Sequence, residues 1–108
     1  MAQLSEAEFE RAADAELHRL LEALIAVGDE LDCDLESGVM SIVFEDDTKY
    51  VVNSHRAARQ IWMAAERSAW HFDYDAGARA WRTTGGDELW STLEAVLARR
   101  LARSLTLR

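Results

Sequence analysis

The sequence of 108 residues contains no proline and one cysteine, Cys33. Without proline, the turns of the chain must be made by glycine, asparagine, aspartate and serine. A single cysteine excludes an intrachain disulfide and a zinc site built from several cysteines, which fits a reducing compartment. Cys33 alternates with acidic residues, so we expect a small buried hydrophobic side chain rather than a nucleophile.

Long apolar runs are also missing, and the longest are a few residues, too short to cross a bilayer. The acidic start MAQLSEAEFER lacks the basic and apolar regions of a signal peptide. We therefore expect a soluble, cytoplasmic protein. The chain is 49% apolar, enough to bury a core, and we assign residues 1–108 to a single domain.

Positive charge is scarce in the first half of the chain. Residues 1–47 contain 14 acidic side chains against Arg11 and Arg19, a net charge of −12, whereas residues 48–108 contain 6 acidic and 10 basic side chains, a net charge of +4. Such a field repels nucleic-acid phosphates and anionic membranes, so we expect neither as a partner. It attracts cations or a basic protein surface, although solubility alone can also account for an acidic chain.

Hydrophobic periodicity predicts a helix at each end of the chain, over residues 5–26 and 88–103. Ser5 and Glu8 have the spacing of a capping box, and Gly28 can end the first helix. Alternating patterns between the helices predict strands at residues 31–36, 39–44, 49–53, 60–65, 70–74 and around Trp81.

Short turns join consecutive predicted strands, so the sheet should be antiparallel. The predicted fold is an α+β two-layer sandwich, in which the N- and C-terminal helices cover one face of an antiparallel sheet of five to six strands. We expect Trp81 and Trp90 in its core. The other face of the sheet must meet solvent or a partner.

Catalytic motifs are absent from the sequence. No P-loop, dinucleotide-binding glycine motif, zinc-protease motif or nucleophile elbow occurs. His18, His55 and His71 lie far apart along the chain, and a lone histidine is more often a surface residue than a metal ligand. We therefore expect a protein that is not an enzyme.

An acidic surface is the strongest candidate site. Asp32, Asp34 and Glu36 share one face of the strand at residues 31–36, and the helix carboxylates Asp14 and Glu22 can flank them. We expect these side chains to form one continuous solvent-facing band, with Glu10 and Glu16 near its border. Hard oxygen donors of this kind suit Mg²⁺, Ca²⁺, Mn²⁺ or Fe²⁺, and exposed carboxylates without a fixed cage should bind such ions weakly.

Two structural interpretations of these carboxylates remain open. Charged residues on an edge strand prevent it from pairing with another sheet. The helix carboxylates also have basic neighbours one turn away, in the pairs Glu8–Arg11, Asp14–His18 and Arg19–Glu22. Neither interpretation explains why five acidic residues lie within residues 29–36 with no basic residue between them.

Trp62 is the second candidate. It alternates with Ile61 and Met63, so it should face out from the sheet if these two face the helices. An exposed tryptophan on an open sheet is typical of an interface hot spot. A strand shifted by one residue would instead place Trp62 in the core. Asn53, at the end of the preceding strand, can lie beside it.

Four segments together resemble the bacterial frataxin family. They are DCDLESGVMSIVFEDDTKYVVN, QIWMA, WHFDYD and GDELWSTLEAVL, and the similarity extends from SEAEFERAAD through the closing helix. The resemblance implies a sandwich of helices on an antiparallel sheet. It also implies a small iron-binding protein of iron–sulfur cluster assembly that docks on the cysteine desulfurase and modulates sulfur transfer to the scaffold protein.

The resemblance implies a weak, reversible site for Fe²⁺ or Fe³⁺ along the first helix and first strand. The matching positions are Glu8, Asp14, Glu22, Asp29, Glu30, Asp32 and Asp34. The partner-binding positions on the sheet match Asn53, Gln60 and Trp62. We expect a monomer that can form iron-dependent oligomers. A ferroxidase or iron-storage protein is the alternative, although the Glu-x-x-His repeat of di-iron helices is absent.

The chain also departs from the family pattern. The segment LIAVG, residues 24–28, is apolar where bacterial relatives tend to be acidic. The acidic band should therefore be thinner at the end of the first helix.

Overall fold

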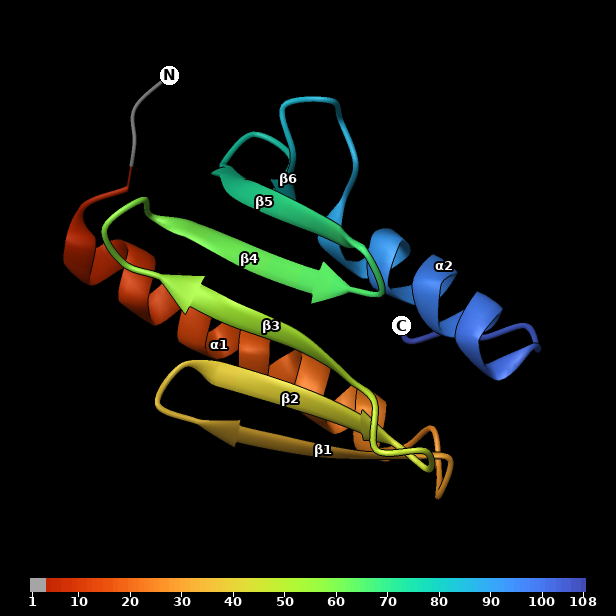
Figure 1. Cartoon of the computed structure of the whole chain (residues 1–108). Coiled ribbons are helices and arrows are strands. Elements are labelled where there is room, and N and C mark those ends of the chain that lie inside the picture. The colour runs from red at the N-terminus through yellow and green to blue at the C-terminus, as the bar shows by residue number, and fades with distance from the viewer. Residues whose placement is uncertain (1–3) are drawn as a thin grey trace.

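The computed structural model describes residues 4–108 and shows a six-stranded antiparallel sheet with both helices packed on one side (Figure 1). The elements, in chain order, are α1 (Glu6–Ile25), β1 (Leu31–Glu36), β2 (Val39–Phe44), β3 (Lys49–His55), β4 (Gln60–Ala65), β5 (Ser68–Asp75), β6 (Ala80–Arg82) and α2 (Leu89–Leu101). Consecutive strands are neighbours, so β1 and β6 form the two edges. The predicted α+β sandwich is confirmed.

Helix α1 begins as the sequence predicts. The Ser5 hydroxyl accepts a hydrogen bond from the Glu8 backbone N–H (3.1 Å), and the Glu8 carboxylate accepts one from the Ser5 N–H (2.9 Å). This capping box satisfies two N–H groups that the helix itself leaves without partners. The helix ends at Ile25, with Ala26 as its C-cap. Neither helix within residues 4–108 is long and apolar enough to span a membrane.

The turn between β1 and β2 requires glycine at one position. Ser37 and Gly38 both have positive φ, 50° and 78°, as two-residue hairpins prefer. A Cβ atom on Gly38 would lie 2.6 Å from the Ser54 hydroxyl oxygen, and the Ser54 N–H donates to the Gly38 carbonyl (2.9 Å). The turn can therefore lie directly against β3, which fixes the register of the first three strands.

The core lies on the helix-covered face of the sheet, where the strand alternation predicted it. Met40, Ile42 and Met63 are at most 1% exposed and pack against the apolar stripes of both helices. Trp81 and Trp90 are buried, as expected. This arrangement leaves the opposite face of the sheet without a covering layer of helices (Figure 1).

Several element ends differ from the prediction. Strand β3 continues to His55, because His55 still pairs with Gln60 across the β3–β4 hairpin. Strand β5 is longer than predicted at both ends and covers Ser68–Asp75. Glu88 is the N-cap of α2 rather than its first residue, and its carboxylate accepts hydrogen bonds from two backbone N–H groups of the first turn (2.9 and 3.1 Å).

Candidate functional site

The open face of the sheet carries the acidic side chains of the edge strand β1. Asp32, Asp34 and Glu36 are exposed, whereas the alternate residues of β1 pack against the core. Across the hairpin, these three residues lie opposite Val43, Ser41 and Val39. None of the three carboxylates makes an ion pair with a residue of the described chain, 4–108. Their charge is therefore available to a partner or a cation.

The expectation of one continuous acidic band is wrong. Helix α1 packs on the sheet face that carries Leu31, Cys33 and Leu35, so Asp32 and Asp34 turn away from it. Successive side chains of a strand point to opposite faces, and residues that alternate with core residues cannot face the core helix. The carboxylates of α1 and those of β1 thus form two separate groups on opposite sides of the sheet.

The helix group is partly engaged in local contacts. Hydrogen bonds from the backbone and side chain of Ser5 lower the pKa of the Glu8 carboxyl below its ordinary value. Asp14 lies 3.5 Å from His18, one turn along, as predicted. Glu22 is exposed on the same helix, but the predicted Arg19–Glu22 pair is not formed.

Arg19 instead binds Glu16. We expected Glu16 at the border of an exposed acidic band, but it is buried. Glu16 is 5% exposed, accepts a hydrogen bond from Arg19 (2.7 Å) and accepts another from the Trp90 indole N–H (3.3 Å). Its carboxylate lies between α1 and α2 and holds them together. A buried acid with two internal donors is a structural group, not part of an exposed site.

The α1–β1 connection supplies Asp29 and Glu30. Asp29 is exposed, whereas the Glu30 carboxylate binds the Arg103 guanidinium beyond the end of α2. A second arginine, Arg100, binds Asp46 in the β2–β3 turn (2.7 Å). The basic end of α2 therefore neutralises acidic side chains of the first half of the chain, and one predicted iron ligand, Glu30, is already in contact with a cation.

A preformed metal cage is not present among residues 4–108, where no group of three or more histidine, cysteine, aspartate or glutamate side chains is close enough to hold an ion. Successive carboxylates on β1 lie about 6–7 Å apart along the strand. Such oxygen donors can hold a hydrated Fe²⁺ ion only loosely. Cys33 is unsuited as a ligand, because burial, and to a lesser extent Asp32, raises the pKa of its thiol to about 11.

Trp62 faces the open side of the sheet, as predicted, but it is half-buried rather than freely exposed. The imidazole rings of His55 and His71 stack on its two faces, with ring centroids 3.8 and 4.3 Å away. Asn53 is opposite Trp62 in the β3–β4 register. The Trp62 indole N–H donates to the Gln60 side-chain oxygen (2.8 Å), so the three predicted partner-binding residues lie together.

His55 and His71 were not recognised as members of this site from the sequence. Their signal is strand pairing: His71 is directly opposite Trp62 across β4 and β5, and His55 follows Asn53 by two residues on β3. Strand alternation then places all of these side chains on one face. The register that brings them together depends on turn lengths that the sequence pattern did not fix.

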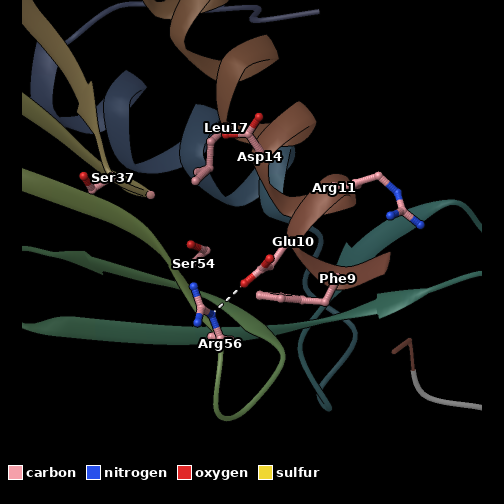
Figure 2. Close-up of a pocket in the computed structure, with 9 residues that line it drawn as sticks. Phe9, Glu10, Arg11, Asp14, Leu17, Ser37, Ser54 and Arg56 are labelled. Carbon is pink, nitrogen blue, oxygen red and sulfur yellow. Dashed lines mark ion pairs between the residues drawn. The ribbon is translucent and has the colours of Figure 1, made fainter. Parts of the chain in front are cut away.

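A groove of about 490 Å³ lies on the helix-covered side of the sheet, between α1 and the β1–β2 hairpin (Figure 2). Phe9 and Leu17 contribute its apolar surface, and the Glu10–Arg56 ion pair (2.7 Å) crosses one end. Arg11 points away from the cavity in Figure 2. Because Glu10 and Arg56 neutralise each other at the end of this groove, it is a weaker candidate site than the open face of the sheet.

The fold and the open acidic face define a class: a small α+β sandwich with two helices on one face of an antiparallel sheet. The family profile of the frataxin-like domain matches residues 2–103. The chain belongs to the frataxin family, as the resemblance indicated.

Relatives of similar length support this assignment. The iron-sulfur cluster assembly protein CyaY of Cupriavidus metallidurans is 36% identical over 112 residues, covering 100% of both chains. The protein of the same name from Thioalkalivibrio sulfidiphilus is 36% identical over 99 residues, covering 88% of this chain and 92% of the relative.

Solved structures share the fold. The frataxin of Psychromonas ingrahamii superimposes with a TM-score of 0.86 at 24% identity, covering 97% of this chain and 99% of that chain. A trimeric frataxin from Saccharomyces cerevisiae, solved in complex with ferrous iron, gives a TM-score of 0.72 at 24% identity, covering 95% and 91%.

Proposed function

We propose that this protein assists iron–sulfur cluster assembly in the cytoplasm as a non-enzymatic adaptor that docks on the cysteine desulfurase and carries iron weakly. Membership of the frataxin family and relatives named as iron-sulfur cluster assembly proteins support the pathway. The observation that carries the docking proposal is the set of carboxylates on β1. They point outward, make no ion pair within residues 4–108 and share the open face with Trp62.

We propose that different parts of this face make different contacts. Asp32, Asp34 and the neighbouring Asp29 offer negative charge to a basic groove of the desulfurase. Asn53, Gln60 and Trp62 lie two to three strands away and offer an aromatic, hydrogen-bonding surface to the scaffold protein. Both partners would approach the open side of the sheet, because α1 and α2 occupy the other side.

Neutralising the acidic group tests the docking. Replacing Asp29, Glu30, Asp32 and Asp34 by the corresponding amides should abolish desulfurase binding measured by calorimetric titration, and wild-type binding should weaken steeply between low and high salt. A control that removes four exposed charges elsewhere should bind almost normally. Its substitutions are Glu6→Gln, Glu45→Gln, Asp47→Asn and Asp87→Asn. Equal affinity for the wild type and the first variant would refute the proposal.

Iron binding is tested by the loss of amide NMR signals on titration with Fe²⁺. We propose the acidic positions that the family resemblance implies as its ligands: Glu8, Asp14, Glu22, Asp29, Glu30, Asp32 and Asp34. Because Ser5 and Arg103 already engage Glu8 and Glu30, broadening should be strongest around Asp29, Asp32 and Asp34. Broadening confined to other surfaces would contradict this assignment.

Oxygen consumption distinguishes the adaptor from a ferroxidase. With Fe²⁺ in excess, the wild type and the variant with neutralised acidic residues should consume oxygen at the same rate as the buffer. Size-exclusion chromatography of the same samples reports whether iron promotes oligomers. Oxygen uptake that depends on the acidic residues would replace the adaptor proposal by an enzymatic one.

A further inference from the structure

The indole of Trp62, on the open face of the sheet, is held between two histidine rings. His55 from β3 and His71 from β5 cover its two faces, and each imidazole plane is inclined by 14° to the indole. The Trp62 N–H donates to Gln60, and the Gln60 amide in turn donates to Asp73 (3.0 Å). The stack and the hydrogen-bonded chain together fix both the tilt and the rotation of the indole, so its edge is presented outward.

The hydrogen bond of His55 sets its protonation state. The backbone N–H of Ala58, in the β3–β4 turn, donates to Nδ1 of His55 (3.2 Å). A ring nitrogen accepts a hydrogen bond only when it carries no proton. The observed arrangement therefore requires a neutral His55 ring with its proton on Nε2, and an imidazolium would place two N–H donors against each other.

Charged groups around the stack come from three other elements. Asp73 of β5 accepts the bond from Gln60 and lies opposite Arg82 of β6. Arg56, next to His55, binds Glu10 of α1 (2.7 Å). Arg59, in the same turn as Ala58, has a buried Nε without a hydrogen-bond partner within residues 4–108. The hydrogen bond from Ala58 is the direct contact that favours one protonation state of His55.

We propose that His55 and His71 are positioning residues that hold Trp62 edge-on for its partner, and that proton uptake at Nδ1 of His55 releases the indole. This inference rests on the proposed docking at Trp62. An imidazolium is attracted to an indole face, but this gain is similar in size to the hydrogen bond that is lost, and the repulsion between the two donors favours release. Docking should therefore weaken in acid.

The size of the effect follows from the fraction of protein in the docking-competent state. If only the neutral-His55 state docks, the apparent dissociation constant rises in inverse proportion to the fraction of protein in that state. Histidine is the side chain type whose charge commonly changes between about pH 5 and 8, so the measurements cover this range. Replacement by glutamine, which keeps an acceptor but has no titrating ring, should remove the pH dependence.

The first measurement uses the free protein. Indole N–H and histidine ring signals are followed by NMR from pH 8 to 5 in the wild type, His55→Gln and His71→Gln. The part of the Trp62 indole shift that follows the His55 ring should be present in the wild type and in His71→Gln, and absent from His55→Gln. The other tryptophan indoles report whether the fold persists. A Trp62 signal that ignores the His55 titration overturns the proposal.

The second measurement is scaffold-protein binding at pH 8 and 6. The wild type should lose affinity at pH 6, and His55→Gln should bind equally at both values. Binding that requires Trp62 but has the same pH dependence in the wild type and His55→Gln overturns this inference alone. Absence of scaffold binding to the wild type at both values overturns the proposed docking, and the inference with it.

Discussion

Replacing the buried acid Glu16 gives the sharpest test of how the two helices are held together. Glu16→Ala removes the acceptor of the Trp90 indole N–H, and Trp90 is only 6% exposed. A buried donor left without a partner costs about 1–3 kcal/mol. Alanine keeps the Cβ atom, so the loss of the one remaining methylene group of Glu16 adds about 0.8 kcal/mol, which the higher helix propensity of alanine offsets by about 0.4 kcal/mol.

The expected destabilisation by Glu16→Ala is therefore about 2–3 kcal/mol, roughly 8–12 °C in Tm for a chain of this size. Glu16→Gln keeps an oxygen acceptor for Trp90 and loses mainly the charged contact with Arg19, whose side chain is 60% exposed. A contact of that kind is worth less than about 1 kcal/mol. The glutamine variant should thus lie much closer to the wild type than the alanine variant.

Urea unfolding at pH 7 measures both variants, with Glu22→Ala as the control on the exposed side of the same helix. The control should change the free energy of unfolding by less than about 0.5 kcal/mol. Two outcomes would show that the Glu16–Trp90 hydrogen bond does not hold the helices together as described. One is equal stability of Glu16→Ala and Glu22→Ala, and the other is an equal loss of stability in Glu16→Gln and Glu16→Ala. Docking and iron binding by Glu16→Gln should be unchanged.

Three further outcomes follow from single contacts. Asp34→Asn should leave stability within about 0.5 kcal/mol of the wild type in urea, because the exposed carboxylate makes no ion pair within residues 4–108; a larger loss would show a structural role. Since hydrogen bonds from the backbone and side chain of Ser5 lower the Glu8 pKa from 4.5, the wild type should be more stable than Glu8→Gln above about pH 5, and thermal scans should show the difference shrinking below pH 4.5. With its pKa raised from 9.0 to about 11, Cys33 has about 100-fold less thiolate at pH 8, so alkylation should be slow until urea unfolds the chain.

Local signals in the sequence predicted most of the fold. The capping box at Ser5 and Glu8, the short turns between consecutive strands and the period-two strands depend on residues a few positions apart, and the structure confirms each of them. The alternation on β1 also predicts which side of the sheet Asp32 faces. If Cys33 faces the helices, its neighbour Asp32 faces away from them. The predicted acidic band failed because it combined this alternation with a helix that lies on the opposite face.

Contacts between distant residues could not be predicted in this way. Glu16 and Trp90 are 74 residues apart, and the stack around Trp62 depends on the pairing of three strands. A carboxylate near the border of an apolar stripe looks the same in sequence whether it meets solvent or an indole from another helix. Its environment is decided by where the second helix docks, and periodicity carries no information on that.

The structure shows where the opposite net charges of the two halves of the chain meet and where they do not. Basic side chains of α2 and the residues after it reach acidic groups at one end of the molecule, in the pairs Arg99–Glu66, Arg100–Asp46 and Arg103–Glu30. They cannot reach the carboxylates of β1 on the open face, because α2 packs on the other face of the sheet. The internal ion pairs therefore leave negative charge at the β1 edge of the open face, on the same side of the sheet as Trp62 but three strands from it. A basic partner approaching this face would meet that field first.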